Sequence, residues 1–130
     1  MRYRGAAVKA AMPPKRVLVL EDEYLIAETL REDLESLGVG VMGPAADCSA
    51  ALELLWRERP DLAILDTHLG SETCEVVLEE CRAQAIPVVI FSGHIPADLP
   101  AFASGLPAIP KPYLIDQLSR ALAANGGGQV

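Results

Sequence analysis

The stretch that decides the fold is Leu62-Ala-Ile-Leu-Asp66, four apolar residues that end on an acid. A short continuous apolar run predicts a β-strand that is buried on both faces, as the inner strands of a parallel sheet are. Runs of the same kind occur at residues 16–20, 39–42, 87–91 and 108–109. The sequence therefore predicts five strands, and Gly43-Pro44 is expected to close the second of them.

Segments with a helical spacing of apolar residues separate these strands, at residues 23–37, 47–59, 72–83 and 114–123. Gly38 is a predicted helix stop and Asp47 a predicted N-cap. The first helix is expected to bury Leu25, Ile26, Leu30, Leu34 and Leu37. Residues 96–107 hold three prolines, so we expect only one short helix there, around residues 100–103. The alternation predicts an α/β fold, a doubly wound parallel sheet with right-handed crossovers whose fourth helix is short or irregular.

Composition and charge limit the classes of function. The chain has 130 residues, of which 51% are hydrophobic, and this suits one globular domain. It has no apolar run that could span a membrane and no signal-peptide pattern, which predicts a cytoplasmic protein. Residues 1–15 carry four basic residues and no acid, which leaves 7 basic against 18 acidic residues, a balance of −11. This excess predicts no binding to nucleic acid and favours a cation or basic partners.

The ends of the chain and the cysteines are expected to be structurally simple. Residues 1–14 are interpreted as a flexible basic tail, in preference to a segment that contacts a partner or a membrane, and residues 125–130 as a disordered tail. The domain between them covers residues 15–124. Three cysteines without a CxxC pair argue against a disulfide scaffold or a zinc site, so we expect buried apolar packing for Cys48, Cys74 and Cys81. Trp56 is expected to pack within its helix.

Polar side chains follow four of the five predicted strands. They are Glu21-Asp22-Glu23 after the first, Asp66 after the third, Ser92 after the fourth and Lys111 after the fifth. Ligands of open α/β sheets bind beyond the carboxyl ends of the strands. Carboxylates gathered there repel one another, and Mg²⁺, which prefers oxygen ligands, removes that conflict. With a lysine and a hydroxyl alongside, the set predicts phosphoryl transfer, in which a central carboxylate is the nucleophile.

Each of these residues also has a local structural explanation. Asp22 fits a helix N-cap, Asp66 a loop residue, Ser92 a turn residue and Lys111 a surface charge. Their joint occurrence at successive strand ends favours a functional site over four independent coincidences.

Three segments resemble the receiver domains of two-component response regulators: Val17-Leu-Val-Leu-Glu-Asp-Glu23, Pro60-Asp-Leu-Ala-Ile-Leu-Asp-Thr-His-Leu-Gly70 and Pro110-Lys-Pro112. The similarity covers about residues 15–124. It implies a flavodoxin-like sheet of strand order 2-1-3-4-5, a cis Lys111-Pro112 bond and a histidine kinase as phosphodonor. It also implies roles for individual residues. Asp66 would be the phosphoacceptor and also a Mg²⁺ ligand. Asp22 would bind Mg²⁺ directly, Glu21 mostly through water, and the backbone carbonyl of His68 would be a further ligand. Ser92 would hydrogen-bond the phosphoryl group and Lys111 would pair with it.

The sequence departs from the common receiver pattern at Ala108, where most members carry an aromatic switch residue. Phe91-Ser-Gly-His94, with Lys-Pro-Tyr113, instead resembles a subgroup with a Phe-Ala-Thr-Gly-Tyr motif. Many of that subgroup are single-domain receivers, partnered by kinases of the HWE or related families. Output is therefore expected to run through residues 93–107. His68 and His94 either flank the phosphoryl group and tune its hydrolysis or are exposed loop histidines.

These observations leave three hypotheses for the function. The leading one is a stand-alone receiver, monomeric or weakly dimeric, that signals to a downstream protein or acts as a phosphorelay shuttle or sink. It is not expected to be an enzyme beyond its own phosphorylation and slow dephosphorylation. The second is a phosphatase with an Asp nucleophile, which usually needs a second Asp where this chain has His68. The third is a scaffold that binds partners without phosphorylation.

Overall fold

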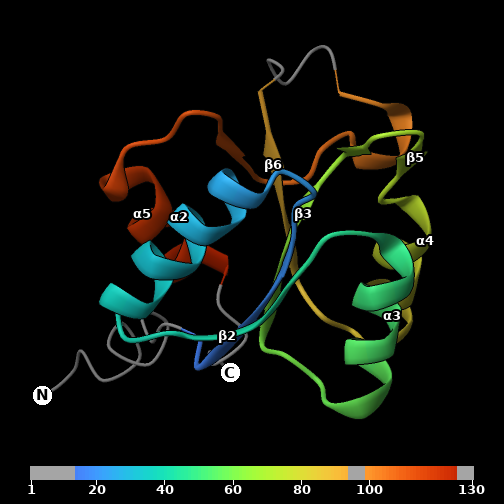
Figure 1. Cartoon of the computed structure of the whole chain (residues 1–130), viewed down its shortest axis with the longest axis horizontal. Coiled ribbons are helices and arrows are strands. Elements are labelled where there is room, and N and C mark those ends of the chain that lie inside the picture. Colours follow the sequence, from blue (N-terminus) through green and yellow to red (C-terminus); the bar gives the residue numbers. More distant parts are fainter. Residues whose placement is uncertain (1–13, 94–98, 126–130) are drawn as a thin grey trace, which may run out of the picture.

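The computed structural model describes residues 14–93 and 99–125 of the chain. Five strands form one parallel sheet in the order β2-β1-β3-β6-β7, which confirms the predicted order 2-1-3-4-5 (Figure 1). Their bounds are β1 Arg16–Leu20, β2 Gly40–Ala45, β3 Leu62–Asp66, β6 Val88–Ser92 and β7 Ala108–Pro110. Every residue of β3 and β6 is buried, as expected for the central strands of a sheet that is covered on both faces.

Helices cover both faces of the sheet (Figure 1). They are α2 Tyr24–Ser36, α3 Cys48–Arg57, α4 Glu75–Ala83 and α5 Ile115–Asn125, with a short 3₁₀ helix, η2, at Ala101–Ala103. Helices α2 and α5 bury Leu30, Leu34 and Leu118 against one face, while α3 and α4 bury Leu55 and Leu78 against the other. Two apolar cores therefore enclose the sheet. None of the helices within residues 14–93 and 99–125 has the length and hydropathy that a membrane span requires.

Local signals explain the limits of the helices. The Asp47 carboxylate accepts a hydrogen bond from the Ala50 amide at 2.8 Å, which confirms the predicted N-cap of α3. Gly38 follows α2 with φ +85°, the conformation that ends helices at glycine. Helix α5 runs to Asn125, two residues beyond its predicted end, and η2 confirms the short helix expected near residues 100–103.

The second strand does not stop before Gly43-Pro44 as the sequence suggested. Strand β2 continues to Ala45, and its pairing with β1 shifts by one residue between Leu18 and Leu20. Glycine is suited to this irregularity at position 43, where φ is +98°. A Cβ atom on any other residue would lie only 2.6 Å from the Ala45 amide nitrogen. The shift brings the Ala45 carbonyl within 2.9 Å of the Glu21 amide, at the carboxyl end of the sheet.

Three further expectations were wrong. The predicted helix over residues 72–83 begins only at Glu75, because residues 68–73 form a small antiparallel hairpin, β4 His68–Leu69 with β5 Glu72–Thr73. Leu25 is 77% exposed and does not belong to the buried face of α2. Trp56 is 67% exposed on α3 and is not packed within the helix. The three cysteines are buried and free, as expected.

Most of the expected tails, residues 1–14 and 125–130, lies outside the described residues, as does His94. The two described residues of these tails do not fit the expectation, because Pro14 is buried and Asn125 is the last residue of α5. The Lys111-Pro112 peptide bond is cis, as the resemblance implied.

Candidate functional site

The carboxyl ends of β1, β3, β6 and β7 meet at one edge of the sheet and bring the candidate residues together. A cavity of about 330 Å³ opens there. It is lined by Asp22, Glu23, Ile26, Asp66, His68, Ser92, Gly93 and Lys111. Five of the seven predicted site residues thus share one cavity, Glu21 lies buried next to it, and His94 is outside the described residues.

Three carboxylates gather at this edge. Glu21, Asp22 and Asp66 each offer an oxygen, and these oxygens lie within 4.8 Å of one another. Glu21 and Asp66 are buried, with 1% and 6% of their surface exposed, whereas Asp22 is exposed. Mg²⁺ takes hard oxygen ligands and keeps several of its waters, so a carboxylate group that is open on one side fits this ion. The donor set suits Mg²⁺ better than a softer metal, because Glu21, Asp22 and Asp66 offer it neither sulfur nor imidazole.

Lys111 forms ion pairs with two of the three acids, Glu21 and Asp66. Its ammonium donates to Asp66 Oδ2 at 2.8 Å and to Glu21 Oε1 at 2.5 Å. Burial alone would lower the pKa of Lys111, but its hydrogen bonds to Asp66 and Glu21 outweigh that effect and raise it. Lys111 therefore carries a full positive charge beside the carboxylate that stands at the centre of the site.

Glu21 has the smallest exposed fraction of the three acids. Burial raises the pKa of its carboxyl group, while hydrogen bonds from Lys111 and from the Glu23 amide act in the opposite direction. The Glu23 amide donates to Glu21 Oε2 at 2.9 Å, so both carboxylate oxygens of Glu21 have partners. The Glu21 side chain is therefore held in place by protein groups next to Asp66.

Asp66 ends β3 and leads into the small hairpin. The His68 amide donates to Asp66 Oδ1 at 3.2 Å, so Asp66 is oriented through both oxygens, one by Lys111 and one by the backbone. The hydroxyl of the buried Thr67 lies 3.0 Å from His68 Nδ1, and the Thr67 carbonyl accepts a hydrogen bond from Cys74. The hairpin that the sequence did not indicate thus fixes the backbone that follows Asp66, and its first residue, His68, is exposed.

Ser92 is the last residue of β6, and only 2% of its surface is exposed. Its carbonyl accepts a hydrogen bond from the Lys111 amide at 3.0 Å, which couples the ends of β6 and β7. The serine and the lysine are therefore positioned by the same pair of strands, and both line the cavity.

Sequence reasoning missed one contributor to the site, Phe91. The Lys111 ammonium lies 4.7 Å from the centre of the Phe91 ring, a distance at which a cation and an aromatic face attract. Phe91 was assigned to a strand and to the motif Phe91-Ser-Gly-His94, but not to the site. Its place directly before Ser92, at the end of a buried strand, was the signal that could have pointed to it.

Comparison with known proteins agrees with this geometry. Residues 17–123 match the family model of the response regulator receiver domain. A curated relative, the transcriptional regulatory protein PdtaR of Mycobacterium tuberculosis, is 31% identical over 116 residues, which cover 86% of this chain and 57% of PdtaR. The solution structure of SdrG from Sphingomonas melonis superposes with a TM-score of 0.75 at 33% identity, covering 85% of this chain and 94% of SdrG. The response regulator PhyR from Brucella abortus gives a TM-score of 0.76 at 26% identity, covering 92% of this chain and 51% of PhyR.

These relatives differ in how much of their length this chain covers. It spans little more than half of PdtaR and of PhyR, but nearly all of SdrG. The match therefore concerns the domain of residues 17–123 and its fold. The further activities of the longer relatives are not assigned to this chain.

Proposed function

Because the chain belongs to the family of response regulator receiver domains, we propose that it accepts a phosphoryl group on Asp66 from a histidine kinase and signals through protein contacts. One observation carries the proposal: Asp66 lies at a cavity, paired with the Lys111 ammonium and next to two further carboxylates. A reactive carboxylate needs its neighbours arranged to neutralise the charge of an incoming phosphoryl group, and this arrangement provides them.

In the transfer step, an oxygen of the Asp66 carboxylate attacks the phosphorus atom. The bond between phosphorus and the donor nitrogen of a phosphohistidine breaks, and the electron pair leaves with the imidazole. When bound, Mg²⁺ neutralises phosphoryl oxygens that gain charge in the transition state. Glu21 and Asp22, with Asp66 itself, would hold the ion, and the His68 carbonyl is the further ligand that the family resemblance implies.

Lys111 and Ser92 have complementary roles in this proposal. Lys111 moves from its carboxylate partners to the phosphoryl oxygens, where its charge is most needed. The Ser92 hydroxyl donates a hydrogen bond to another phosphoryl oxygen, which requires its side chain to face the cavity that it lines. His68 and His94 are proposed to tune the lifetime of the acyl phosphate. His68 is exposed and lines the cavity, and His94 follows the lining residue Gly93 in the sequence.

The output of the domain is proposed to pass through the segment after Ser92. Ala108 is exposed in β7 and offers no aromatic side chain that could follow the phosphoryl group. Phe102 and Leu106, by contrast, pack against the core on the α3 and α4 side, and Arg82 of α4 donates to the Phe102 carbonyl at 3.4 Å. A shift of residues 99–107 would therefore reach the surface of α4, where a downstream protein could detect it.

Labelling with a small phosphodonor tests the proposal. Acetyl phosphate with Mg²⁺ is expected to add one phosphoryl group to the wild type and none to Asp66→Ala, as measured by intact-protein mass spectrometry. Asp116→Asn is the matched control, because it removes an exposed carboxylate on α5 that does not line the cavity. Equal labelling of the wild type and Asp66→Ala would contradict the assignment of Asp66. Steady release of phosphate with many turnovers would point instead to a phosphatase.

A further inference from the structure

Tyr113 joins the loop after Lys111 to the last turn of α2. Its hydroxyl donates to Asp33 Oδ2 at 2.5 Å, across 80 residues of sequence, and both side chains are half-buried. Burial and the neighbouring Asp33 carboxylate raise the pKa of Tyr113, so the phenol keeps its proton and remains the donor at neutral pH. A hydrogen bond to a charged acceptor is among the stronger single contacts in a protein.

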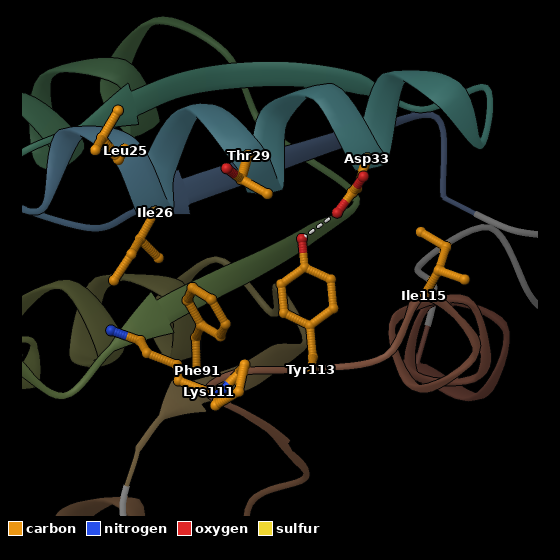
Figure 2. A pocket seen from close by; sticks show the side chains of 9 residues that line it. Leu25, Ile26, Thr29, Asp33, Phe91, Lys111, Tyr113 and Ile115 are labelled. Atoms are coloured by element: carbon orange, nitrogen blue, oxygen red, sulfur yellow. Dashed lines mark hydrogen bonds between the residues drawn. The ribbon is translucent and has the colours of Figure 1, made fainter.

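Tyr113 also contacts Phe91, the aromatic residue over whose ring the Lys111 ammonium lies. The Tyr113 and Phe91 rings meet edge to face, with centroids 5.8 Å apart and an interplanar angle of 63°. Phe91 in turn lies beneath the Lys111 ammonium at 4.7 Å. Figure 2 shows the Phe91 ring between the Lys111 ammonium and the Tyr113 ring, with the Tyr113 hydroxyl turned toward Asp33 on α2.

The loop around Tyr113 is anchored at the Lys111 amide, which donates to the Ser92 carbonyl, and at the Tyr113 ring, which packs against the core, but the residues beside Tyr113 are exposed. Leu114 and Ile115, which follow it, are 70% and 47% exposed, and Pro112 is exposed as well. A mainly apolar cavity of about 560 Å³ separates the loop from α2, and Leu25, Ile26 and Phe91 are among its lining residues. Without the bond to Asp33, the side chains of Tyr113 and Lys111, which both line this cavity, have room to shift into it.

We infer that Tyr113 is a positioning residue, which binds Asp33 and thereby holds the Lys111 ammonium on Asp66 and Glu21. This inference rests on the proposed function, since it assigns Tyr113 a part in the same phosphoryl transfer. Lys111 shares Glu21 and Asp66 with the site that would hold Mg²⁺. A loosened Lys111 therefore has two opposite effects: it stabilises the transferred phosphoryl group less, and it competes less with the cation for the carboxylates.

The substitution Tyr113→Phe removes the hydroxyl and keeps the ring. It is expected to slow phosphorylation by acetyl phosphate about three- to tenfold, the size expected for one lost hydrogen bond that acts through positioning. It is also expected to tighten Mg²⁺ binding about two- to threefold, as measured by isothermal titration without any phosphodonor. Asp33→Ala should reproduce both changes, and Asp33→Asn, which still offers an acceptor oxygen, should restore much of the wild-type behaviour.

Two comparisons make the test specific. Tyr24→Phe is the matched control, because it removes a phenol hydroxyl from a residue that is 74% exposed and lines neither cavity. In a Lys111→Ala background, Tyr113→Phe should leave Mg²⁺ affinity unchanged, since the group through which it acts is gone. Circular dichroism of each variant checks that the fold is kept.

Opposite changes in the two measurements, absent from Tyr24→Phe and abolished in the Lys111→Ala background, are the expected result. The inference is overturned if Tyr113→Phe changes neither property, if rate and Mg²⁺ affinity fall together, or if the effect on affinity persists without Lys111. Failure of the wild type to take up phosphate would contradict the proposed function alone, because the Mg²⁺ titrations still decide whether Tyr113 positions Lys111.

Discussion

The Lys111 ammonium lies 2.8 Å from Asp66 Oδ2, although 45 residues separate the two in the sequence. The contact exists because β3 and β7 end at the same edge of the sheet, on either side of β6. The pair places a fixed positive charge where a phosphoryl group on Asp66 would carry its negative charge.

Replacing this lysine should therefore affect the transfer far more than the fold. Lys111→Met keeps the apolar part of the side chain and removes its charge. Loss of one preorganised charged donor is expected to slow phosphorylation by acetyl phosphate about 100-fold. Lys15→Met is the control, because the described contact of Lys15 uses its backbone amide and not its ammonium. A rate for Lys111→Met within about twofold of the wild type would show that this charge does not assist the reaction.

Binding of Mg²⁺ should stabilise the folded chain, because the three carboxylates come together only in the native state. At ten times the dissociation constant the gain is about 1.4 kcal/mol, which raises the melting temperature by about 5 °C. Asp22→Asn removes one of these carboxylates and is expected to lose most of the shift. Glu32→Gln neutralises an exposed acid elsewhere on α2 and should keep it. An equal shift in all three proteins would place the cation elsewhere.

The central site could be predicted from the sequence because it depends on strand ends. An apolar run that stops on Asp66 or before Lys111 marks both the strand and the edge at which it ends, and parallel pairing then brings these residues together. Glu21, Asp22 and Ser92 follow from the same rule, and all of them lie at or beside one cavity.

Features that depend on contacts between distant segments could not be predicted in this way. Leu25 has the helical spacing of a core residue. It lies in the first turn of α2, where it lines the apolar cavity and stays exposed. Trp56 was expected to be a packed helix residue, whereas α3 presents it to solvent. The bond between Tyr113 and Asp33 leaves no local pattern, since neither residue is at a strand end or in a capping position.

Gly43 is expected to be intolerant of a side chain. A Cβ there would lie 2.6 Å from the Ala45 amide nitrogen and 3.1 Å from the Val19 carbonyl, at a backbone φ of +98°. Gly43→Ala should therefore lower the free energy of unfolding by about 3 kcal/mol, measured by urea denaturation. Gly38→Ala has a similar φ of +85° but open space around it, and should cost only about 1 kcal/mol. Equal losses would show that the close contact at Gly43 relaxes freely.

The buried thiol of Cys81 gives a pH dependence of known sign. Burial raises its pKa from 9.0 to about 12, so above pH 9 the unfolded chain releases a proton that the folded chain retains. The stability that this thiol contributes is complete below pH 9 and is lost as the pH rises toward 12. Between about pH 9.5 and 11, Cys81→Ala should reduce the decline in unfolding free energy by up to about 1.4 kcal/mol per pH unit. Parallel curves for the two proteins would contradict this assignment, whatever their difference in absolute stability.

The identity of the phosphorylated residue is the most direct test of the account. The wild-type chain is treated with acetyl phosphate and Mg²⁺, the acyl phosphate is reduced with borohydride, and the modified residue is located by peptide mass spectrometry. The account predicts homoserine at position 66 and unmodified acids at positions 21 and 22. Homoserine at another acidic position, with an intact Asp66, would contradict it.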